Sequence, residues 1–384
     1  MPFLDTTLPI LDRLIAFPTV SADGNRACTE WLAEQLTEAG ARIEILPDAT
    51  GEKANLFATM GPEGDGGLVL SGHTDVVPVA GQDWSSDPFA MTEKDGAIYG
   101  RGSCDMKGFV AACTALAHRV DATRLTRPLH FAFTYDEEIG CFGGQALTEW
   151  LAERGLSPAL TLVGEPTTLS VIEGHKGCYE YTTRIRGRAG HGSDPRAGVN
   201  AAETAAAYVQ TLIGCRAELD ARAPEGSPFA PPGTTINVGS ISAGFAHNVI
   251  AAEAVIEWEM RPVQPGDAAL VHERLATFVD ETLPGMQATA PEAAIETETI
   301  GEVDGLEPRR DNGMRDLIFA LTGQNQAGVV AFGTEAGLFQ QAGMDVAICG
   351  PGSIAQAHQA DEFVTRAQLE DCCDLLDRLV QRLY

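Results

Sequence analysis

The sequence predicts an α/β protein in which a larger domain, with a mostly parallel sheet covered by helices on both faces, is interrupted by an α+β domain. Short apolar runs alternate with segments of helical spacing in the first part of the chain and again near its end. This pattern is typical of buried parallel strands joined by helices. Between these parts lie strands that alternate apolar and polar residues, as half-exposed antiparallel strands do.

The chain is long enough for more than one domain. It has 384 residues, 44% of them hydrophobic and 21% charged, which is ordinary for a folded globular protein. At roughly 150 residues per domain this length predicts two or three domains. The pattern changes near Gly177 and changes back near Gly301. We therefore assign residues 1–177 and 301–384 to one discontinuous domain and residues 178–300 to the inserted one.

The elements of the larger domain follow in chain order. Its predicted helices span residues 8–16, 27–39, 108–120, 145–154, 314–321 and 367–383. Its predicted strands span residues 41–46, 54–60, 68–71, 129–135, 159–166, 328–332 and 346–349. Each strand is a short apolar run bounded by turn residues, so the sheet is expected to be buried on both faces.

The inserted domain has a different pattern. Its predicted strands span residues 179–186, 234–240, 252–260 and 294–300, and its helices span residues 200–212 and 271–282. A Pro- and Gly-rich stretch, 223–233, separates the first helix from the second strand. This order predicts two helices on one face of an antiparallel sheet.

Composition excludes several classes of partner. The formal net charge is −28, so no basic surface is available for nucleic acid or for an anionic membrane. No apolar run approaches the ~18 residues of a membrane-spanning helix. The N-terminus carries Asp5 and lacks the features of a signal peptide, and the nine cysteines form no C-x-x-C pair. We expect a reduced, cytoplasmic protein whose partner is a small molecule.

Acidic and imidazole side chains follow the predicted strands of the larger domain. In an open α/β sheet, binding sites form beyond the carboxyl ends of the strands. Side chains of this kind would repel one another there unless cations neutralise them. The residues at these positions are His73, Asp75, Asp105, Glu137, Glu138, Glu165 and His358.

The ligand types favour Zn²⁺ or a similar divalent ion, and their number fits two ions better than one. If Asp105 bridges, His73 and Glu165 complete one site, and Glu138 and His358 complete the other. Paired ions of this kind support hydrolysis. Each residue also has a structural alternative: an Asp as a helix cap, the two Glu as a solvated loop, a His as a local hydrogen-bonding group. Their number and the Gly-rich turns around them favour the metal site.

Five motifs in order resemble a known family, the dinuclear-zinc metallopeptidases that include aminoacylases, glutamate carboxypeptidase and succinyl-diaminopimelate desuccinylase. The motifs are GHTDVVP (72–78), GRGSCDMKG (100–108), DEEIG (136–140), GEP (164–166) and QAHQADE (356–362). The segments HKG, GHGSDPRAGVNA, FGTEAGLF and GPGSIAQAHQADEF are most similar to the acetylornithine deacetylases of that family. The resemblance implies hydrolysis of N2-acetyl-L-ornithine to L-ornithine and acetate, a step of arginine biosynthesis. A desuccinylase or a broad N-acyl-amino-acid hydrolase is the alternative, and a non-catalytic metal- or amino-acid-binding protein is a further one.

The resemblance also implies roles for single residues. It makes Glu137 the general acid/base and Asp75 the partner of His73. It implies a homodimer in which His191 of the inserted lid domain reaches the partner subunit's site; a local hydrogen bond is the alternative for His191. It implies two bound Zn²⁺ ions, with Co²⁺ as the alternative. The implied metal ligands are His73, Asp105, Glu138, Glu165 and His358.

Five further residues are expected to contact the substrate. The resemblance places Asn248 and Arg261 at its carboxylate, and Lys176 is another candidate for an anion contact; Arg261 could instead be a surface strand residue. We take Thr334 as a further contact and infer that Glu335 pairs with a cationic side-chain amine, with capping of the following helix as the alternative. Cys104 and Cys141 adjoin the metal-site loops and are considered as soft ligands.

Overall fold

The structure is a computed structural model that describes residues 2–384, and the chain divides into two compact units. The first unit contains the chain up to Gly174 together with Leu306–Val329 and Thr334–Tyr384. The second unit contains His175–Gly305 and Val330–Gly333. Each unit has its own buried apolar core, as is typical of a structural domain.

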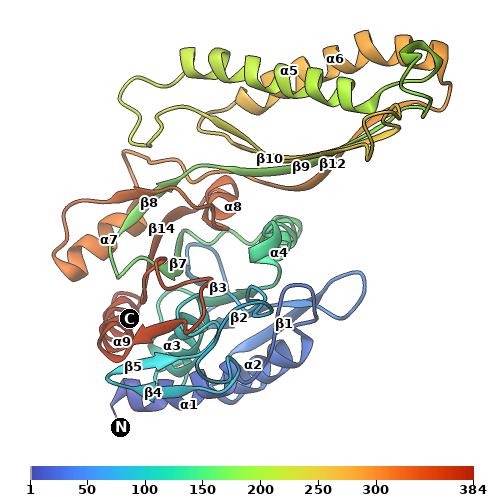
Figure 1. The fold of residues 1–384 in the computed structure, drawn as a ribbon. Helices are drawn as coiled ribbons and strands as arrows, with labels where there is room; N and C mark the ends of the chain where they lie inside the picture. The colour runs from blue at the N-terminus through green and yellow to red at the C-terminus, as the bar shows by residue number, and fades with distance from the viewer. Residues whose placement is uncertain (1) are drawn as a thin grey trace. The chain divides into compact units, whose positions relative to one another are not determined.

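An eight-stranded sheet forms the centre of the first unit (Figure 1). In order across the sheet, its strands are β1 (Arg42–Pro47), β2 (Ala54–Met60), β6 (Leu129–Thr134), β3 (Leu68–His73), β7 (Leu160–Pro166), β14 (Asp345–Gly350), β8 (Ile172–His175) and β13 (Gly328–Val330). Strands β6, β3, β7 and β14 are parallel, while β1, β2 and β8 pair antiparallel. The predicted mostly parallel sheet is confirmed in its central strands.

Helices cover both faces of this sheet, which also confirms the prediction (Figure 1). The helices of one face are α1 (Phe3–Ile15), α2 (Arg26–Glu38), α3 (Lys107–Ala117), α7 (Gly313–Thr322) and α9 (Arg366–Gln381). The helices of the other face are α4 (Phe142–Arg154) and α8 (Ala336–Gln341). Every residue of β3 and β6 is consequently buried.

The helices form where apolar residues recur at helical spacing. In α1, Leu4, Leu11 and Leu14 lie on one buried stripe, and in α9 Leu369, Cys372 and Leu376 do the same. Such a stripe buries one face of a helix against its neighbours. Both helices pack on α3, which is buried throughout its length.

A small second sheet of the first unit was not predicted. It consists of β15 (Phe363–Thr365), β5 (Ala97–Tyr99) and β4 (Thr92–Lys94) in that order. These strands have only three residues each, too few to show a periodic pattern. The pairing of Phe363 with Tyr99 brings two loops from distant parts of the chain together.

The second unit is an antiparallel sheet with two helices (Figure 1). Its strand order is β10 (Thr235–Ala243), β11 (Glu253–Arg261), β9 (Cys178–Arg186) and β12 (Ala294–Val303). Helices α5 (Ala201–Ala221) and α6 (Asp267–Thr289) pack on the sheet through a core that includes Tyr208 and Trp258. The predicted α+β architecture is confirmed. The remaining elements of the chain are the 3₁₀ turns η1 (Ala122–Arg124), η2 (Glu137–Ile139) and η3 (Pro195–Ala197).

Among residues 2–384, no helix combines the length and the apolar character needed to cross a membrane. All nine cysteines are free, and eight of them are buried.

A buried histidine in β6 makes the stability of the first unit depend on pH. His130 is 4% exposed, bonds Thr59 Oγ1 through Nδ1 at 2.8 Å and stacks on Phe57. Burial, with a smaller contribution from the nearby Arg42, lowers the pKa of His130 from 6.5 to about 4. Above pH 6.5 neither the folded nor the unfolded chain is protonated at this site. As the pH falls below 6.5 the unfolded chain takes up the proton first, so stability is lost.

The loss should reach about 3 kcal/mol near pH 4, since each pKa unit corresponds to about 1.4 kcal/mol. We expect His130→Gln, which does not titrate, to flatten the difference in unfolding free energy between pH 7 and pH 4.5, measured by chemical denaturation. The control is His118→Gln, because His118 is exposed. Equal pH dependence of His130→Gln and the wild-type chain would contradict this account.

Candidate metal centre

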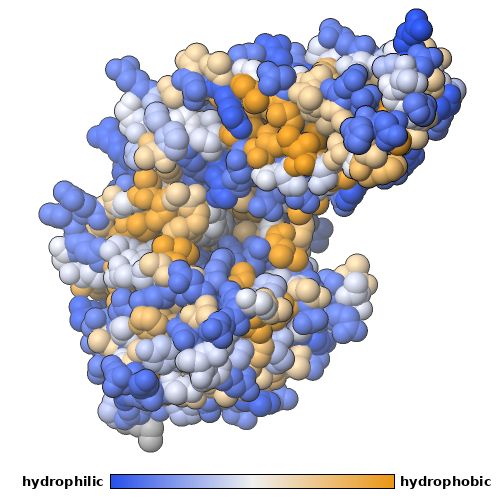
Figure 2. Space-filling view, viewed as in Figure 1, coloured by the Kyte–Doolittle hydropathy of each residue, from blue (hydrophilic) through white to orange (hydrophobic). Residues whose placement is uncertain are grey.

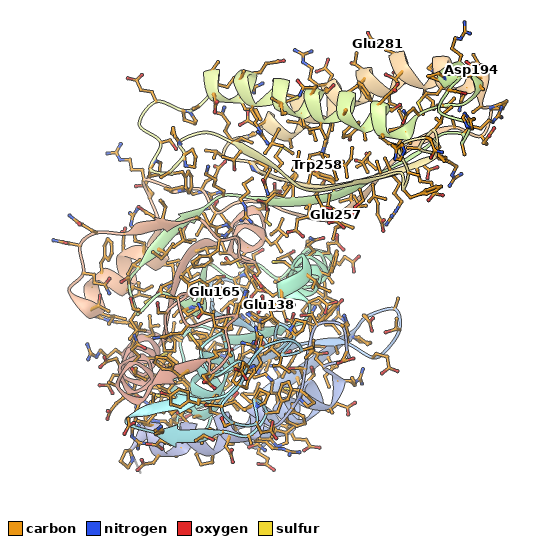
Figure 3. All side chains as sticks on the ribbon, viewed as in Figure 1. Glu138, Glu165, Asp194, Glu257, Trp258 and Glu281 are labelled. Atoms are coloured by element: carbon orange, nitrogen blue, oxygen red, sulfur yellow. The ribbon has the colours of Figure 1, made fainter. Side chains whose placement is uncertain are left out.

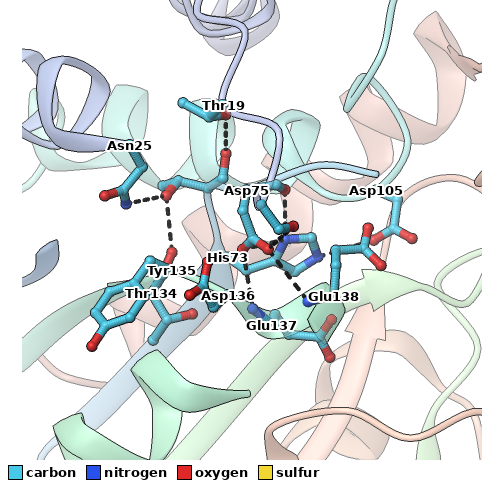
Figure 4. Close-up of polar contacts among 12 residues, drawn as sticks. Thr19, Asn25, His73, Asp75, Asp105, Thr134, Tyr135, Asp136, Glu137 and Glu138 are labelled. Atoms are coloured by element: carbon cyan, nitrogen blue, oxygen red, sulfur yellow. Dashed lines mark hydrogen bonds and ion pairs between the residues drawn. The ribbon is translucent and has the colours of Figure 1, made fainter. Parts of the chain in front are cut away.

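Strand ends of the first unit bring acidic and imidazole groups to one place (Figures 3 and 4). His73 is the last residue of β3, and Glu165 lies near the end of β7. The turn η2, which carries Glu137 and Glu138, follows β6. Asp105 lies just before α3. Because β3, β6 and β7 are parallel neighbours, their carboxyl ends meet at the same edge of the sheet.

Asp105 lies between the two histidines. Its Oδ1 is 3.2 Å from His73 Nε2, and its Oδ2 is 3.3 Å from His358 Nε2. The backbone of His358 is in the left-handed region, with φ 62°, which is sparsely populated for a residue with a side chain. One carboxylate thus presents one oxygen to each imidazole, as a bridging ligand would.

Two further carboxylates complete the cluster. Glu138 Oε2 is 3.0 Å from His358 Nε2, and Glu165 Oε1 is 3.9 Å from His73 Nε2. Ligand atoms of His73, Asp105 and Glu138 all lie within 4.8 Å of one another, and so do those of His73, Glu137 and Glu165. The structure therefore brings together all five residues expected to bind metal.

Asp75 connects the strand end of β3 to the turn η2 (Figure 4). Its Oδ1 is 3.5 Å from His73 Nδ1 and accepts a hydrogen bond from the backbone N–H of Glu137 at 3.2 Å. Its Oδ2 accepts from Ser21 Oγ at 2.7 Å and from the backbone N–H of Glu138 at 3.3 Å. The backbone O of Asp75 also lies 2.9 Å from His73 Nδ1, so Asp75 contacts His73 and its carboxylate caps the turn. Sequence reasoning did not identify Ser21 or the capping contacts.

The electrostatics of the cluster are those of crowded carboxylates. Burial, followed by repulsion from Asp105, raises the pKa of Glu138 and, well above the usual range, that of Glu165. Burial likewise raises the pKa of Glu137 well above its ordinary value, although His73 opposes the shift. Burial would raise the pKa of Asp105, but hydrogen bonds from His358 and His73 lower it. The cluster therefore has more buried negative charge than its two imidazoles can neutralise.

One buried oxygen has no donor. Among residues 2–384, none donates a hydrogen bond to Glu165 Oε1, and the residue is only 4% exposed. A buried carboxylate oxygen without a donor carries a substantial desolvation cost. A cation among these oxygens would remove this cost, so the donor set fits a divalent ion.

Glu335 is a buried carboxylate that contacts strands β3 and β6. It is 1% exposed, and its carboxylate accepts hydrogen bonds from Ser71 Oγ at 2.6 Å and from Thr134 Oγ1 at 2.8 Å. Glu335 is the N-cap residue of α8, the position of the capping alternative, but its side chain makes no capping hydrogen bond; Thr334 Oγ1 accepts from Ala336 N instead. The contact of Thr334 with substrate and the pairing of Glu335 with a substrate amine stay predictions. The structure gives Glu335 the hydroxyls of β3 and β6 as partners.

The other expected contact residues lie in the second unit and form two pairs. His191 and Asn248 are exposed and adjacent, since Gly192 N donates to Asn248 O at 2.8 Å. His191 Nδ1 lies 2.7 Å from Ser193 Oγ, which is the local hydrogen bond considered as its alternative.

Lys176 and Arg261 form the second pair. Lys176 Nζ donates to Gly233 O at 2.7 Å, and Arg261 pairs with Glu259 at 2.9 Å. Burial and the charge of Arg261 lower the pKa of Lys176. The backbone brings the two residues near each other, since Gly177 N donates to Pro262 O at 2.9 Å. Contact of Lys176 and Arg261 with a substrate anion stays a prediction.

The two cysteines near the cluster are buried thiols. Cys104 Sγ contacts Ser353 O at 3.4 Å, and Cys141 Sγ lies 3.6 Å from Glu137 Oε1. Burial, with added repulsion from nearby carboxylates, raises the pKa of both thiols, and the thiolate is the form that binds metal. Within residues 2–384 neither belongs to a group of potential ligands. The alternative that Cys104 and Cys141 act as soft metal ligands therefore has no support.

Comparisons with known proteins agree with this geometry. Residues 69–382 match the family model described as Peptidase family M20/M25/M40. An acetylornithine deacetylase of Proteus mirabilis (strain HI4320) is 38% identical over 386 residues, covering 98% of this chain and 97% of the relative. An acetylornithine deacetylase of Pasteurella multocida (strain Pm70) is 36% identical, covering 99% of this chain and 98% of the relative.

Solved structures share the fold. An M20 family metallo-carboxypeptidase from Sulfolobus solfataricus matches with a TM-score of 0.74 at 18% identity, covering 98% of this chain and 99% of the other. A Bacillus subtilis protein described as a dinuclear metal-binding peptidase of the M20 family matches with a TM-score of 0.64 at 17% identity, covering 98% and 97%.

Proposed function

The chain belongs to Peptidase family M20/M25/M40, and from this premise we propose that it is a metal-dependent amidohydrolase that converts N2-acetyl-L-ornithine to L-ornithine and acetate. The observation that carries the proposal is Asp105, which has one oxygen toward each imidazole and lies in a cluster that includes Glu137. The relatives named acetylornithine deacetylase support the choice of substrate. That substrate would place the reaction in arginine biosynthesis, in the cytoplasm.

Two divalent ions, Zn²⁺ or alternatively Co²⁺, would be held by five side chains. His73 and Glu165 would hold one ion, Glu138 and His358 the other, and Asp105 both. When bound, such ions lower the pKa of water and stabilise negative charge on a carbonyl oxygen. Asp75, whose backbone O lies 2.9 Å and whose Oδ1 lies 3.5 Å from His73 Nδ1, would fix the tautomer and orientation of that ligand.

Glu137 would transfer the protons of the reaction. It directly precedes the proposed ligand Glu138, and the Asp75 carboxylate accepts hydrogen bonds from the backbone N–H of both residues. The side chain of Glu138 could therefore bind metal while that of Glu137 does not. Glu137 would accept a proton from the attacking water and then donate it to the departing amine. General acid/base catalysis of this kind typically contributes 10²–10⁴-fold to a rate.

A substrate panel tests the proposal. Metal-free enzyme and enzyme reloaded with Zn²⁺ or Co²⁺ would be assayed for release of acetate or succinate from N2-acetylornithine, N-acetylmethionine and N-succinyl-diaminopimelate. We expect activity only in the reloaded enzyme, with the highest kcat/KM for N2-acetylornithine. Preference for the succinyl compound would favour a desuccinylase, equal rates on both acetyl substrates a broad aminoacylase, and no activity on any of them a binding protein.

The second unit would act as lid and dimerisation domain. Strand β10 is an edge of its sheet. Beside it lies a groove of about 340 Å³ lined by Arg216 and by the apolar side chains of Val209, Ile213, Val238 and Ile241. Figure 2 shows apolar side chains gathered on this face of the second unit. An unpaired edge strand next to exposed apolar residues is suited to pairing with a second copy, so these features support a homodimer.

In that homodimer His191 would act on the partner subunit's reaction. We expect His191→Ala to lower kcat roughly 10²–10³-fold, the usual effect of removing one oxyanion donor, with metal content unchanged. Ser193→Ala, which removes only the local partner of His191, is the control.

A mixing experiment tests whether His191 acts across the interface. Mixing His191→Ala with an inactive Glu137→Gln variant would form heterodimers in which one site has both residues intact. Such a mixture should recover about a quarter of the wild-type activity, as expected for random pairing in a symmetric dimer. Full kcat of His191→Ala would reject the role, and failure to recover activity would reject its position across the interface.

A further inference from the structure

A buried ion pair, Arg101–Glu362, lies beneath the loops that carry two of the metal-binding residues. Both side chains are 1% exposed, and Arg101 Nη1 is 2.6 Å from Glu362 Oε2. A buried ion pair is weak evidence for stability, since desolvation of the charges offsets their attraction. Within residues 2–384, moreover, no group accepts a hydrogen bond from the buried Arg101 Nε. A contribution to stability therefore does not explain why this ion pair is buried here.

Glu362 fixes the backbone of the loop that leads to Asp105. Its Oε1 accepts hydrogen bonds from the N–H groups of Cys104 at 2.9 Å and Asp105 at 3.0 Å. Its Oε2 accepts from the N–H of Gly102 at 3.0 Å. One carboxylate thus holds three backbone groups of this loop, including that of Asp105 itself.

Arg101 extends the same network to the loop of His358. Its guanidinium donates to Gln359 O at 3.3 Å and to Gln82 Oε1, and it lies over the ring of Trp84 at 5.0 Å. Gln82 Nε2 in turn donates to His358 O at 2.8 Å. The network therefore reaches the backbone at His358 and at the residue after it.

We propose that Glu362 and Arg101 are positioning residues that hold the loops of Asp105 and His358 in register, so that Asp105 faces both imidazoles. The proposal rests on the metal site of the proposed function. The two loops are more than 250 residues apart in the chain. Besides the network, the short β5–β15 pairing and hydrogen bonds to the backbone O of Glu362 and of Ser353 join them, but none of these contacts fixes the N–H of Asp105. Without the ion pair these contacts would remain, but the N–H of Asp105 would lose its acceptor on Glu362 and the loop of His358 would lose its link to Arg101.

The test compares metal binding by folded variants. In Glu362→Gln the amide NH₂ replaces an acceptor, so at least one backbone contact and the charge partner of Arg101 are lost. We expect Zn²⁺ affinity, measured by competition with a chelator, to fall 10–100-fold, as for other residues that orient metal ligands. The absorption spectrum of the Co²⁺ form should also change. Circular dichroism would establish that each metal-free variant is folded at the temperature used.

Asp267→Asn is the matched control. Asp267 is a carboxylate of the second unit that is 1% exposed, pairs with Arg222 and accepts from Thr234. This variant should lose stability without changing Zn²⁺ affinity or the Co²⁺ spectrum.

Gln82→Ala is a milder variant, since Gln82 is partly exposed and its removal leaves the ion pair intact. It should weaken only one of the two metal equivalents, and it keeps the proposal testable if Glu362→Gln does not fold. The positioning role is overturned if Glu362→Gln, or Gln82→Ala in its place, binds both ions with wild-type affinity and an unchanged Co²⁺ spectrum. A wild-type chain that binds no divalent ion would instead overturn the metal site and with it the proposed function.

Discussion

Glu137→Gln is expected to lower kcat for N2-acetylornithine by about 10²–10⁴-fold while the protein keeps its full metal content. The amide has nearly the shape of the carboxylate but cannot accept the proton of the attacking water, and the loss of a general base typically costs 10²–10⁴-fold. Metal ligation should survive, because the proposed ligand of the pair is Glu138, which lies 3.0 Å from His358. The measurement is acetate release together with elemental analysis of the same sample.

The control for this variant is Glu153→Gln, because Glu153 is an exposed residue of α4 in the same unit. It should retain wild-type kcat and metal content. A Glu137→Gln enzyme with more than a tenth of wild-type activity would remove Glu137 from the proton-transfer role, and one that has lost metal would make Glu137 a ligand instead.

The sequence was sufficient for those parts of the fold and the site that depend on local pattern. β3 and β6 are mostly apolar segments that end at polar residues, so both the strands and the groups at their ends could be predicted. The cluster followed because parallel strands present their carboxyl ends at one edge.

Contacts across long chain separations could not be predicted in the same way. Glu335 bonds Ser71 and Thr134, and Glu362 bonds the N–H of Asp105. The way in which the strands of the first unit align with one another determines these hydrogen-bond partners, together with the three-residue pairing of β5 with β15. No periodic pattern in the sequence encodes that register.

Tertiary packing also determined where the long helices end. We predicted that the first helix of the inserted domain ends at Leu212, two residues before Gly214, but α5 continues to Ala221. Glycine weakens a helix by about 1 kcal/mol, and burial of Cys215 and Leu219 beyond it offsets that cost.

Asp105→Ala is expected to abolish both the binding of two ions and the hydrolytic activity. Asp105 has one oxygen 3.2 Å from His73 Nε2 and the other 3.3 Å from His358 Nε2, so its loss removes a ligand from each ion. In the wild-type protein, an ion at 1,000 times its Kd should raise the unfolding free energy by about 4 kcal/mol. Asp105→Ala should show little of this stabilisation when Zn²⁺ is added at the same concentration, measured by thermal denaturation with and without a chelator.

Glu165→Ala is the comparison that separates a bridging from a terminal ligand. Glu165 lies near His73, so its removal should weaken one ion and leave the other bound, with one equivalent of Zn²⁺ in elemental analysis. Two equivalents retained by Asp105→Ala would show that this carboxylate does not bridge. Equal loss of both ions in the two variants would show that the ions bind only as a pair, whichever ligand is removed.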